Sequence, residues 1–265
     1  MTSETFGSRL TAMRAAAPLV QCITNYVAMN VAANVLLAAG ASPAMVHSEE
    51  EAGEFAALAG ALTINIGTVS PDWIAGMTAA AGGALAAGRP WVLDPVAHMA
   101  TAYRRRIVAE LLELQPAIIR GNASEILALG GGASKARGVD AKDEVAVAEE
   151  AARKLALARK SVVAVTGRTD FVTDGTRTAR IAGGSDWMPR VTALGCSLTC
   201  LVGAYAAMED DPFAATVAAL THFAVSGRQA HAQAQGPGSF AVAFLDALAT
   251  VDGAALDTQA EVELS

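Results

Sequence analysis

The stretch LTINIGTVSPD at residues 62–72 decides the fold. It opens on a short apolar run of strand length, and Gly67 and Thr68 follow that run at once. Ser70 is then a suitable helix cap, and Pro71 falls at the first helical position, where a missing N–H is tolerated. A strand that passes through a short turn into a capped helix is the first half of a βαβ unit.

The same arrangement recurs along the chain. Short apolar runs, each followed by a longer segment of helical period, lie at 19–24, 44–47, 62–66, 91–93, 117–119 and 161–165. This alternation predicts an α/β fold with a mostly parallel central sheet covered by helices on both faces. Asp174-Gly175, between the runs 171–173 and 176–181, suits a two-residue hairpin turn and predicts a small antiparallel edge. Beyond residue 190 we expect only helices, with a break at 236–238.

Size and charge restrict the classes of protein. A chain of 265 residues, 53% of them apolar, can bury its own core, so we expect a single domain over residues 1–265. The net charge of −7 argues against a nucleic-acid partner, and Arg104-Arg105-Arg106 is expected to lie on the solvent-exposed face of an amphipathic helix. The glycine-rich segment 130–143 is expected to be a mobile loop.

The cysteines indicate a reducing compartment. Cys22, Cys196 and Cys200 are an odd set without a CxxC pair, so neither a disulfide framework nor a thiolate zinc site is indicated, and a cytoplasmic location fits. A signal peptide is not expected, because the N-terminal apolar stretch is broken early. Residues 191–208 carry no charge and approach membrane-span length, but the turn residues within them favour a buried helix, so no membrane association is expected.

Polar residues gather directly after the predicted strands, where ligands bind in open parallel sheets. Asp94 and Glu125 are the carboxylates nearest to strand ends, and two such acids suit a nucleotide-bound Mg²⁺ that keeps several waters. Glu125 alternatively closes a capping box with Asn122, three positions earlier. Arg120 at a strand end needs an anionic partner, for which a phosphate is well suited.

The stretch Ala193-Leu194-Gly195-Cys196 precedes a predicted buried helix. If that helix starts here, the amides of Leu194, Gly195 and Cys196 face a ligand above the turn and, with the helix dipole, form an anion hole for a phosphoryl group. The same field is expected to lower the pKa of the Cys196 thiol, which could then take the proton of a substrate alcohol. Cys200, one turn further, is expected to be a core residue. No Walker loop and no GxGxxG motif follows a strand, which disfavours a dinucleotide-binding oxidoreductase.

These residues resemble the hydroxyethylthiazole kinase family. The matching motifs occur in order, at 21–27 (QCITNYV), 42–45 (SPAM), 65–68 (NIGT), 93–96 (LDPV), 120–125 (RGNASE), 165–167 (VTG) and 236–240 (GPGSF). The resemblance implies a ribokinase-like fold without a separate lid, and ATP-dependent phosphorylation of the primary alcohol of 4-methyl-5-(2-hydroxyethyl)thiazole in thiamine synthesis. It also implies Mg²⁺ with the ATP, and a homotrimer with active sites between subunits.

The resemblance also implies roles for single residues. Met45 and Ala193 match positions whose backbone amides meet the thiazole, and the rest of that pocket is formed by Asn25, Gly67 and Thr68. The nucleotide contacts fall to Arg120, Thr166 and Asn122, and the magnesium and phosphate end to Asp94 and Glu125. Cys196 stands where related sugar kinases carry an aspartate base.

Two departures from the family pattern affect these expectations. Ala193 replaces the family's usual glycine, so a contact through its amide is expected only if the backbone there needs no positive φ. His98 follows the Asp-Pro-Val motif, and we expect it to be structural. A kinase of the hydroxymethylpyrimidine type and a non-catalytic binding protein are the alternatives.

Overall fold

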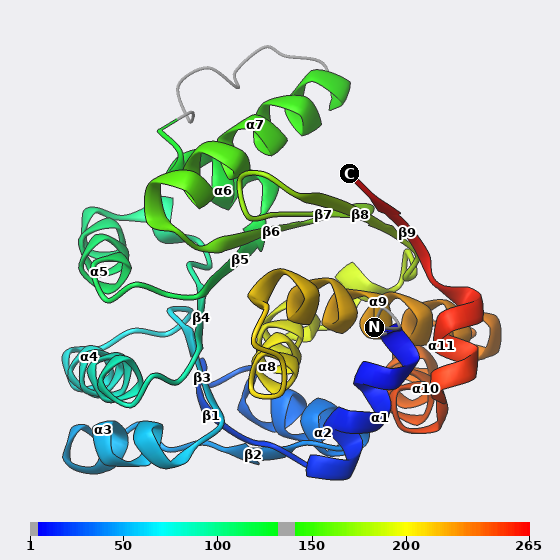
Figure 1. The fold of residues 1–265 in the computed structure, drawn as a ribbon, viewed down its shortest axis with the longest axis horizontal. Helices are drawn as coiled ribbons and strands as arrows, with labels where there is room; N and C mark the ends of the chain where they lie inside the picture. The colour runs from blue at the N-terminus through cyan, green and yellow to red at the C-terminus, as the bar shows by residue number, and fades with distance from the viewer. Residues whose placement is uncertain (1–4, 132–140) are drawn as a thin grey trace.

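One sheet runs through the part of the chain that the computed structural model describes, residues 5–131 and 141–265, with the side chains of 141–146 left out. Its nine strands have the order β2-β1-β3-β4-β5-β6-β7-β8-β9 (Figure 1). They are β1 (Leu19–Ile23), β2 (Ser42–Ala44), β3 (Ala61–Asn65), β4 (Trp91–Asp94), β5 (Ile118–Asn122), β6 (Val162–Thr166), β7 (Thr169–Thr173), β8 (Thr178–Ala182) and β9 (Glu261–Leu264). The pairs from β2 to β6 are parallel, and those from β6 to β9 are antiparallel.

Helices cover both faces of this sheet, as the sequence predicts (Figure 1). One face is covered by α1 (Phe6–Ala16), α2 (Met29–Ala39), α8 (Leu194–Ala206), α9 (Pro212–Gln233), α10 (Pro237–Thr250) and α11 (Gly253–Gln259). The other is covered by α3 (Glu49–Leu58), α4 (Pro71–Ala86), α5 (Ala102–Leu112), α6 (Ala123–Leu129) and α7 (Ala141–Arg159). Each face therefore has its own apolar core.

The strands supply alternate residues to the two cores. In β5, Ile118 packs into the core under α8 and α9, whereas Ile119 packs into the core under α4 and α5. In β6, Val162 and Val163 divide in the same way. Because successive side chains of a strand point to opposite faces, strands buried on both sides read as the continuous apolar runs of the sequence.

The starts of two helices confirm the local signals. The Ser70 hydroxyl accepts a hydrogen bond from the Trp73 N–H at 3.4 Å, with Pro71 at the first helical position of α4. At α6 the Asn122 side chain accepts from the Glu125 N–H, and the Glu125 carboxylate accepts from the Asn122 N–H. Both helices start directly beyond the carboxyl end of a strand, so their N-termini face that edge of the sheet.

Other details differ from the sequence prediction. The strand expected at 44–47 lies at Ser42–Ala44. The break expected at 236–238 is confirmed with a small shift, since α9 ends at Gln233 and α10 begins at Pro237. The antiparallel hairpin is confirmed, but its two-residue turn is wrong: Thr173 pairs with Thr178, so residues 174–177 form the loop, where Asp174 accepts two backbone N–H groups. β9 pairs with β8 where the sequence predicts only helices.

Two further predictions concern loops and membranes. Most of the loop expected at 130–143, namely 132–140, lies outside the described residues. Across the described ranges, no single helix is both long and apolar enough to span a membrane, although α10 and α11, bent by 113°, meet the length and composition test as a pair.

A buried histidine in the helical layer makes the fold sensitive to acid. His222 in α9 is fully buried, and its ring nitrogens lie 3.1 Å from the Tyr205 hydroxyl and 3.2 Å from the Leu248 carbonyl oxygen. Burial, and then the Arg14 cation, lower the pKa of His222 from 6.5 to about 3. Between these pH values the unfolded chain binds a proton that the native chain does not, so acid stabilises the unfolded state.

We therefore expect the free energy of unfolding to fall by roughly 1 kcal/mol for each unit by which the pH is lowered from 6.5 to 3, because of His222 alone. Above pH 6.5 His222 should have no such effect. His222→Gln keeps one acceptor for Tyr205 and one donor for Leu248, but does not titrate. Urea unfolding of both proteins at several pH values measures the difference between their free energies of unfolding. The titration of all other groups is common to the two proteins and cancels in this difference. Equal pH dependence in the two proteins would contradict this account.

Candidate active site

Five neighbouring parallel strands each place one polar residue at the same edge of the sheet. In the order of the sheet, β1, β3, β4, β5 and β6 contribute Asn25, Asn65, Asp94, Arg120 and Thr166. Asn65, Asp94 and Thr166 are the last residues of their strands, Arg120 lies two residues before the end of β5, and Asn25 lies two residues beyond the end of β1. The sequence predicted four of the five as site residues, and the structure brings all of them together.

Polar contacts connect these side chains in strand order. Asn25 Nδ2 donates to Asn65 Oδ1 at 2.9 Å, and Asn65 Nδ2 donates to Asp94 Oδ2 at 2.8 Å. The next contact is an ion pair, with Arg120 Nη1 3.5 Å from Asp94 Oδ2. Finally, Arg120 Nη2 donates to Thr166 Oγ1 at 2.6 Å. We call these five residues the strand-end chain.

Cys196 lies beside this strand-end chain. Its Sγ accepts a hydrogen bond from Asn25 Nδ2 at 3.3 Å. The neighbouring Gly195 lies so close to Arg120 that a Cβ at residue 195 would be 3.2 Å from both terminal guanidinium nitrogens. Cys200, in contrast, is 1% exposed and packs into the core, as predicted. The two thiols therefore have different surroundings, and only Cys196 is at the strand-end edge.

The helix α8 begins where the sequence predicts a helix start. The helix begins at Leu194, so the amides of Leu194, Gly195 and Cys196 belong to its first turn, where N–H groups have no partner within the helix. The Ser197 N–H is already used, since it donates to the Ala193 carbonyl at 2.9 Å. Three backbone donors and the positive end of a helix dipole thus lie next to Arg120.

The backbone at Ala193 has the positive φ on which the sequence prediction depends. Ala193 is the N-cap of α8, with φ 66° and ψ 2°, in the left-handed region. The condition for an amide contact there, a backbone that needs no positive φ, is therefore not met. The alanine nevertheless adopts the conformation that suits glycine, at a cost of about 1 kcal/mol.

Replacement of Ala193 by glycine should remove that strain. We expect Ala193→Gly to raise the free energy of unfolding by about 0.5–1 kcal/mol, as measured by urea denaturation. The matched control is Ala109→Gly, at an exposed position inside α5, where glycine should lower stability by about as much. If both variants lose stability equally, the left-handed conformation at residue 193 carries no strain.

The predicted lowering of the Cys196 pKa is wrong. Burial, followed by the negative charge of Asp94, raises the pKa of this thiol above its usual value. The hydrogen bond from Asn25 and the charge of Arg120 act in the opposite direction but do not prevail. The helix-dipole argument considered only the turn itself, whereas the carboxylate and the burial come from other strands.

Asp94 and Glu125 differ in their suitability for a metal. Asp94 is 1% exposed, and its Oδ1 is buried without a hydrogen-bond partner among the described residues. Burial raises the pKa of Asp94, while Arg120 opposes this shift. Glu125 accepts the N–H groups of Ala97 and Asn122 at 2.9 and 2.8 Å, so it does close the capping box.

These carboxylates fit a metal that arrives with a nucleotide. In the described residues, no group of three or more potential ligands forms a ready-made metal cage. Mg²⁺ needs no such cage, since one or two carboxylates, several waters and substrate phosphates suffice. The unpartnered Asp94 Oδ1 is the oxygen best placed to bind the metal.

The predicted nucleotide residues line one cavity of about 560 Å³. Arg120, Asn122 and Thr166 form part of its wall together with Leu194 and Gly195. The structure thus brings the nucleotide residues and the anion hole to a single space. The half-buried carboxylate of Asp170 also lines this cavity, and desolvation raises its pKa to about 6.

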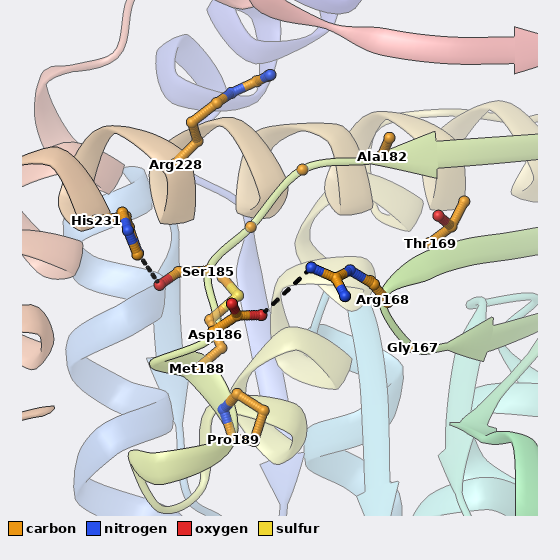
Figure 2. Close-up of a pocket in the computed structure, with 12 residues that line it drawn as sticks. Gly167, Arg168, Thr169, Ala182, Ser185, Asp186, Met188, Pro189, Arg228 and His231 are labelled. Carbon is orange, nitrogen blue, oxygen red and sulfur yellow. Dashed lines mark hydrogen bonds and ion pairs between the residues drawn. The ribbon is translucent and has the colours of Figure 1, made fainter.

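A larger cavity of about 720 Å³ shares Gly167, Arg168, Gly183, Gly184, Met188 and Pro189 with the first. Figure 2 shows its wall, in which the Ser185 hydroxyl points at the His231 ring, 2.7 Å from Nδ1. The Arg168 side chain extends toward Asp186 across the opening (Figure 2). The two cavities together form an extended recess beyond β6, β7 and β8.

The predicted thiazole residues lie on the other side of Cys196. Gly67 packs directly on Asn25, since a Cβ at 67 would be 2.7 Å from Asn25 Nδ2. Thr68 Oγ1 accepts the Tyr26 N–H at 3.1 Å, which ties this turn to the one after β1. Met45 follows β2, the outermost strand on this side of the sheet. Cys196 therefore lies between a nucleotide side and the predicted substrate side.

Sequence reasoning missed three residues that support the site. Asn65 lies inside the strand predicted at 62–66, was not assigned a role, and is the last residue of β3 in the structure. Thr199 donates to Asp94 Oδ2 at 2.9 Å from within α8. Arg104 is not on a solvated face: it donates to the carbonyls of Ile66, Gly67 and Val96, at 2.7, 2.6 and 3.2 Å. Only its neighbours Arg105 and Arg106 are exposed as predicted.

His98 is structural, as expected. Its side chain is 4% exposed, and Nδ1 lies 3.2 Å from the Pro95 carbonyl oxygen. Burial lowers its pKa, so the ring is neutral near pH 7 and fixes the turn after Asp94.

Solved structures resemble this fold to different degrees. A hydroxyethylthiazole kinase from Pyrococcus horikoshii is 38% identical and superimposes with a TM-score of 0.91 over 98% of each chain. The pyridoxal kinase from Staphylococcus aureus in complex with AMP-PCP and pyridoxal has a TM-score of 0.62 at 14% identity, over 94% of this chain and 98% of that chain. The second likeness concerns the fold alone.

Sequence comparison extends the first likeness. A protein of Rhizobium rhizogenes named hydroxyethylthiazole kinase is 69% identical over 261 residues, which are 98% of this chain and 97% of that protein. The family model described as the hydroxyethylthiazole kinase family matches residues 10–253, which include the whole strand-end chain and Cys196. With site, fold and sequence in agreement, the chain belongs to the hydroxyethylthiazole kinase family.

Proposed function

We propose that this kinase transfers the γ-phosphoryl group of ATP to the primary alcohol of 4-methyl-5-(2-hydroxyethyl)thiazole, a step in thiamine synthesis. The observation that carries the proposal is the place of Cys196. Its sulfur accepts a hydrogen bond from Asn25 on the predicted thiazole side, while Gly195 packs on Arg120 on the nucleotide side. An alcohol beside Sγ would therefore face a phosphoryl group held at the start of α8.

The residues divide the work of the transfer. Arg120 and Thr166 bind the phosphates, and the amides of 194–196 gather the charge of the moving phosphoryl group. Cys196 Sγ orients the alcohol, and in its thiolate form it accepts the alcohol proton late and becomes a thiol, because the nucleophile of a loose transition state stays protonated for most of the reaction. The raised pKa of Cys196 limits the thiolate near neutral pH, so positioning contributes more than base strength.

Asp94, with Glu125 behind it, is the proposed holder of Mg²⁺. The metal, when bound with ATP, supplies charge neutralisation between the phosphates. The chain's own contribution is to keep the Asp94 carboxylate fixed, through hydrogen bonds from Asn65 and Thr199.

Release of ADP tests this function. The purified protein, ATP and Mg²⁺ should release ADP with the thiazole alcohol, and not with 4,5-dimethylthiazole, which lacks the hydroxyl. Faster turnover of a hydroxymethylpyrimidine would favour the alternative kinase. Thiazole binding without turnover of either alcohol would favour a binding protein that has lost the transfer chemistry.

We further propose a homotrimer with the active site between subunits, formed by one domain over residues 1–265 in the cytoplasm. Next to the thiazole side, the neighbouring apolar side chains of Tyr26 and Val27 are 66% and 59% exposed. Burial of these two side chains against a partner subunit would support an assembly at this edge. The three cysteines, all free, suit a reducing compartment. Sedimentation as a monomer at micromolar concentration would contradict the trimer.

A further inference from the structure

Asn65 occupies the centre of the strand-end chain and touches both of its halves. On one side its Oδ1 accepts hydrogen bonds from Asn25 Nδ2 and from the Gly67 N–H, each at 2.9 Å. On the other side its Nδ2 donates to Asp94 Oδ2 at 2.8 Å. The side chain is 1% exposed, so this amide is fully desolvated and its contacts are made within the protein.

The two halves belong to different reactants of the proposed reaction. Asn25 donates to Cys196 Sγ at 3.3 Å, which is the alcohol end. Asp94 lies 3.5 Å from the Arg120 guanidinium, which is the phosphate end. Asn65 is the one member of the strand-end chain whose side chain contacts both ends, because β3 lies between β1 and β4 in the sheet.

We infer that Asn65 is a positioning residue, which acts through Asn25 and Asp94 to hold the Cys196 sulfur and the Arg120 guanidinium in register for the transfer. This inference rests on the proposed function. An amide suits the position because it offers an acceptor to Asn25 and a donor to the Asp94 carboxylate at once. A residue with only one kind of group would leave a buried polar partner unsatisfied.

The first test is the kinetics of Asn65→Ala with ATP and the thiazole alcohol. We expect kcat to fall by about ten- to a hundredfold, since small misplacements of reacting groups have effects of that size. The KM values should change little, because the substrate-contacting residues remain. The matched control is Thr63→Val, two residues earlier on the same face of β3 and 2% exposed, for which kcat should not change.

A double-mutant cycle with Cys196→Ala separates positioning from a general structural effect. If Asn65 acts partly through Cys196, the two substitutions together should lower kcat by less than the product of their separate effects. Effects that multiply would show that Asn65 acts independently of the thiol and would overturn the inference. Asn65→Ser replaces the alanine variant in these assays if the latter does not fold, as judged by circular dichroism.

A second readout does not depend on activity. Cys22 and Cys200 are 0% and 1% exposed, so alkylation by iodoacetamide should report on Cys196, with Cys196→Ala as the blank. The hydrogen bond from Asn25 lowers the pKa of this thiol. Loss of Asn65 removes the acceptor that orients Asn25 Nδ2, although Asn25 Oδ1 still accepts the Ala28 N–H at 3.0 Å. The hydrogen bond to Cys196 should therefore weaken, and the pH midpoint of alkylation should shift upward in Asn65→Ala and stay constant in Thr63→Val.

The outcomes distinguish the inference from the proposed function. Absence of ADP release by the unaltered protein counts against the function, and the alkylation midpoint then decides whether Asn65 holds Asn25 on the sulfur. Normal activity of the unaltered protein, combined with an unchanged kcat in Asn65→Ala, overturns the inference alone. An unchanged alkylation midpoint also overturns it, since Asn65 would then exert no effect on the thiol.

Discussion

Replacement of Cys196 by alanine is expected to lower kcat by about ten- to a thousandfold, below the full effect of a strong general base because positioning contributes more than base strength at this thiol. The substitution leaves the backbone amides of 194–196 in place, so the anion hole should survive and KM for ATP should change little. Cys196→Asp should keep substantial activity, because a carboxylate can orient the alcohol and accept its proton. Turnover of the alanine variant at the rate of the unaltered protein would remove Cys196 from the mechanism.

The pH dependence of kcat tests whether the Cys196 thiolate accepts the proton. Because burial and Asp94 raise the pKa of Cys196, the fraction of thiolate grows as the pH rises through the alkaline range. If the thiolate accepts the proton, kcat of the unaltered protein should increase with pH, whereas kcat of Cys196→Asp should vary less. Steady-state rates between pH 6 and pH 10 measure the two profiles. A flat profile for the unaltered protein would mean that the thiol only orients the alcohol.

Replacement of Arg120 by methionine is the second large effect. Arg120 is 11% exposed and pairs with Asp94, whose side chain is 1% exposed. Removal of the cation leaves a buried carboxylate uncompensated, which we expect to lower the free energy of unfolding by about 3 kcal/mol. It also removes the proposed phosphate ligand, so KM for ATP should rise at least tenfold, while KM for the thiazole alcohol should be little affected.

Two controls separate stability from binding. Arg120→Lys keeps the positive charge beside Asp94 but loses the planar guanidinium that binds a phosphate through two hydrogen bonds. Its free energy of unfolding should therefore be closer to that of the unaltered protein than that of Arg120→Met, whereas its binding of ATP should still be weak. Arg106→Met removes a 66%-exposed arginine that pairs with Glu110 on the same helix, where the change should be within about 0.5 kcal/mol. Urea unfolding and ATP titrations provide both quantities. An Arg120→Met protein with normal stability and normal KM for ATP would contradict its proposed role.

The strands of the parallel sheet were predictable because each combines an apolar run with a polar end. In β4, for example, Trp91–Asp94 is fully buried, and the change from leucine to aspartate marks its carboxyl end. The edges of the sheet gave weaker signals. β2 contains Pro43 and is only half-buried, which accounts for its displaced position, and β9 has one half-buried residue among exposed ones. Edge strands bury too little surface to leave a clear apolar pattern.

The site was predictable as a list of residues and not as a set of contacts. The carboxyl ends of neighbouring parallel strands must meet, which is why Asn25, Asp94, Arg120 and Thr166 could be grouped. The pKa of Cys196 could not be predicted, since it depends on the Asp94 charge from another strand. Arg104 was misplaced for a similar reason: nothing in an arginine run tells which member will find buried carbonyls.

The account depends most on the claim that the start of α8 holds the moving phosphate next to the Cys196 sulfur. A crystal structure with the thiazole alcohol and AMP-PCP measures this directly. We expect the alcohol oxygen about 3–3.5 Å from Sγ, on the side of the γ-phosphate, with that phosphate on the amides of 194–196. An alcohol turned away from the sulfur, or phosphates bound at a different edge of the sheet, would contradict the mechanism.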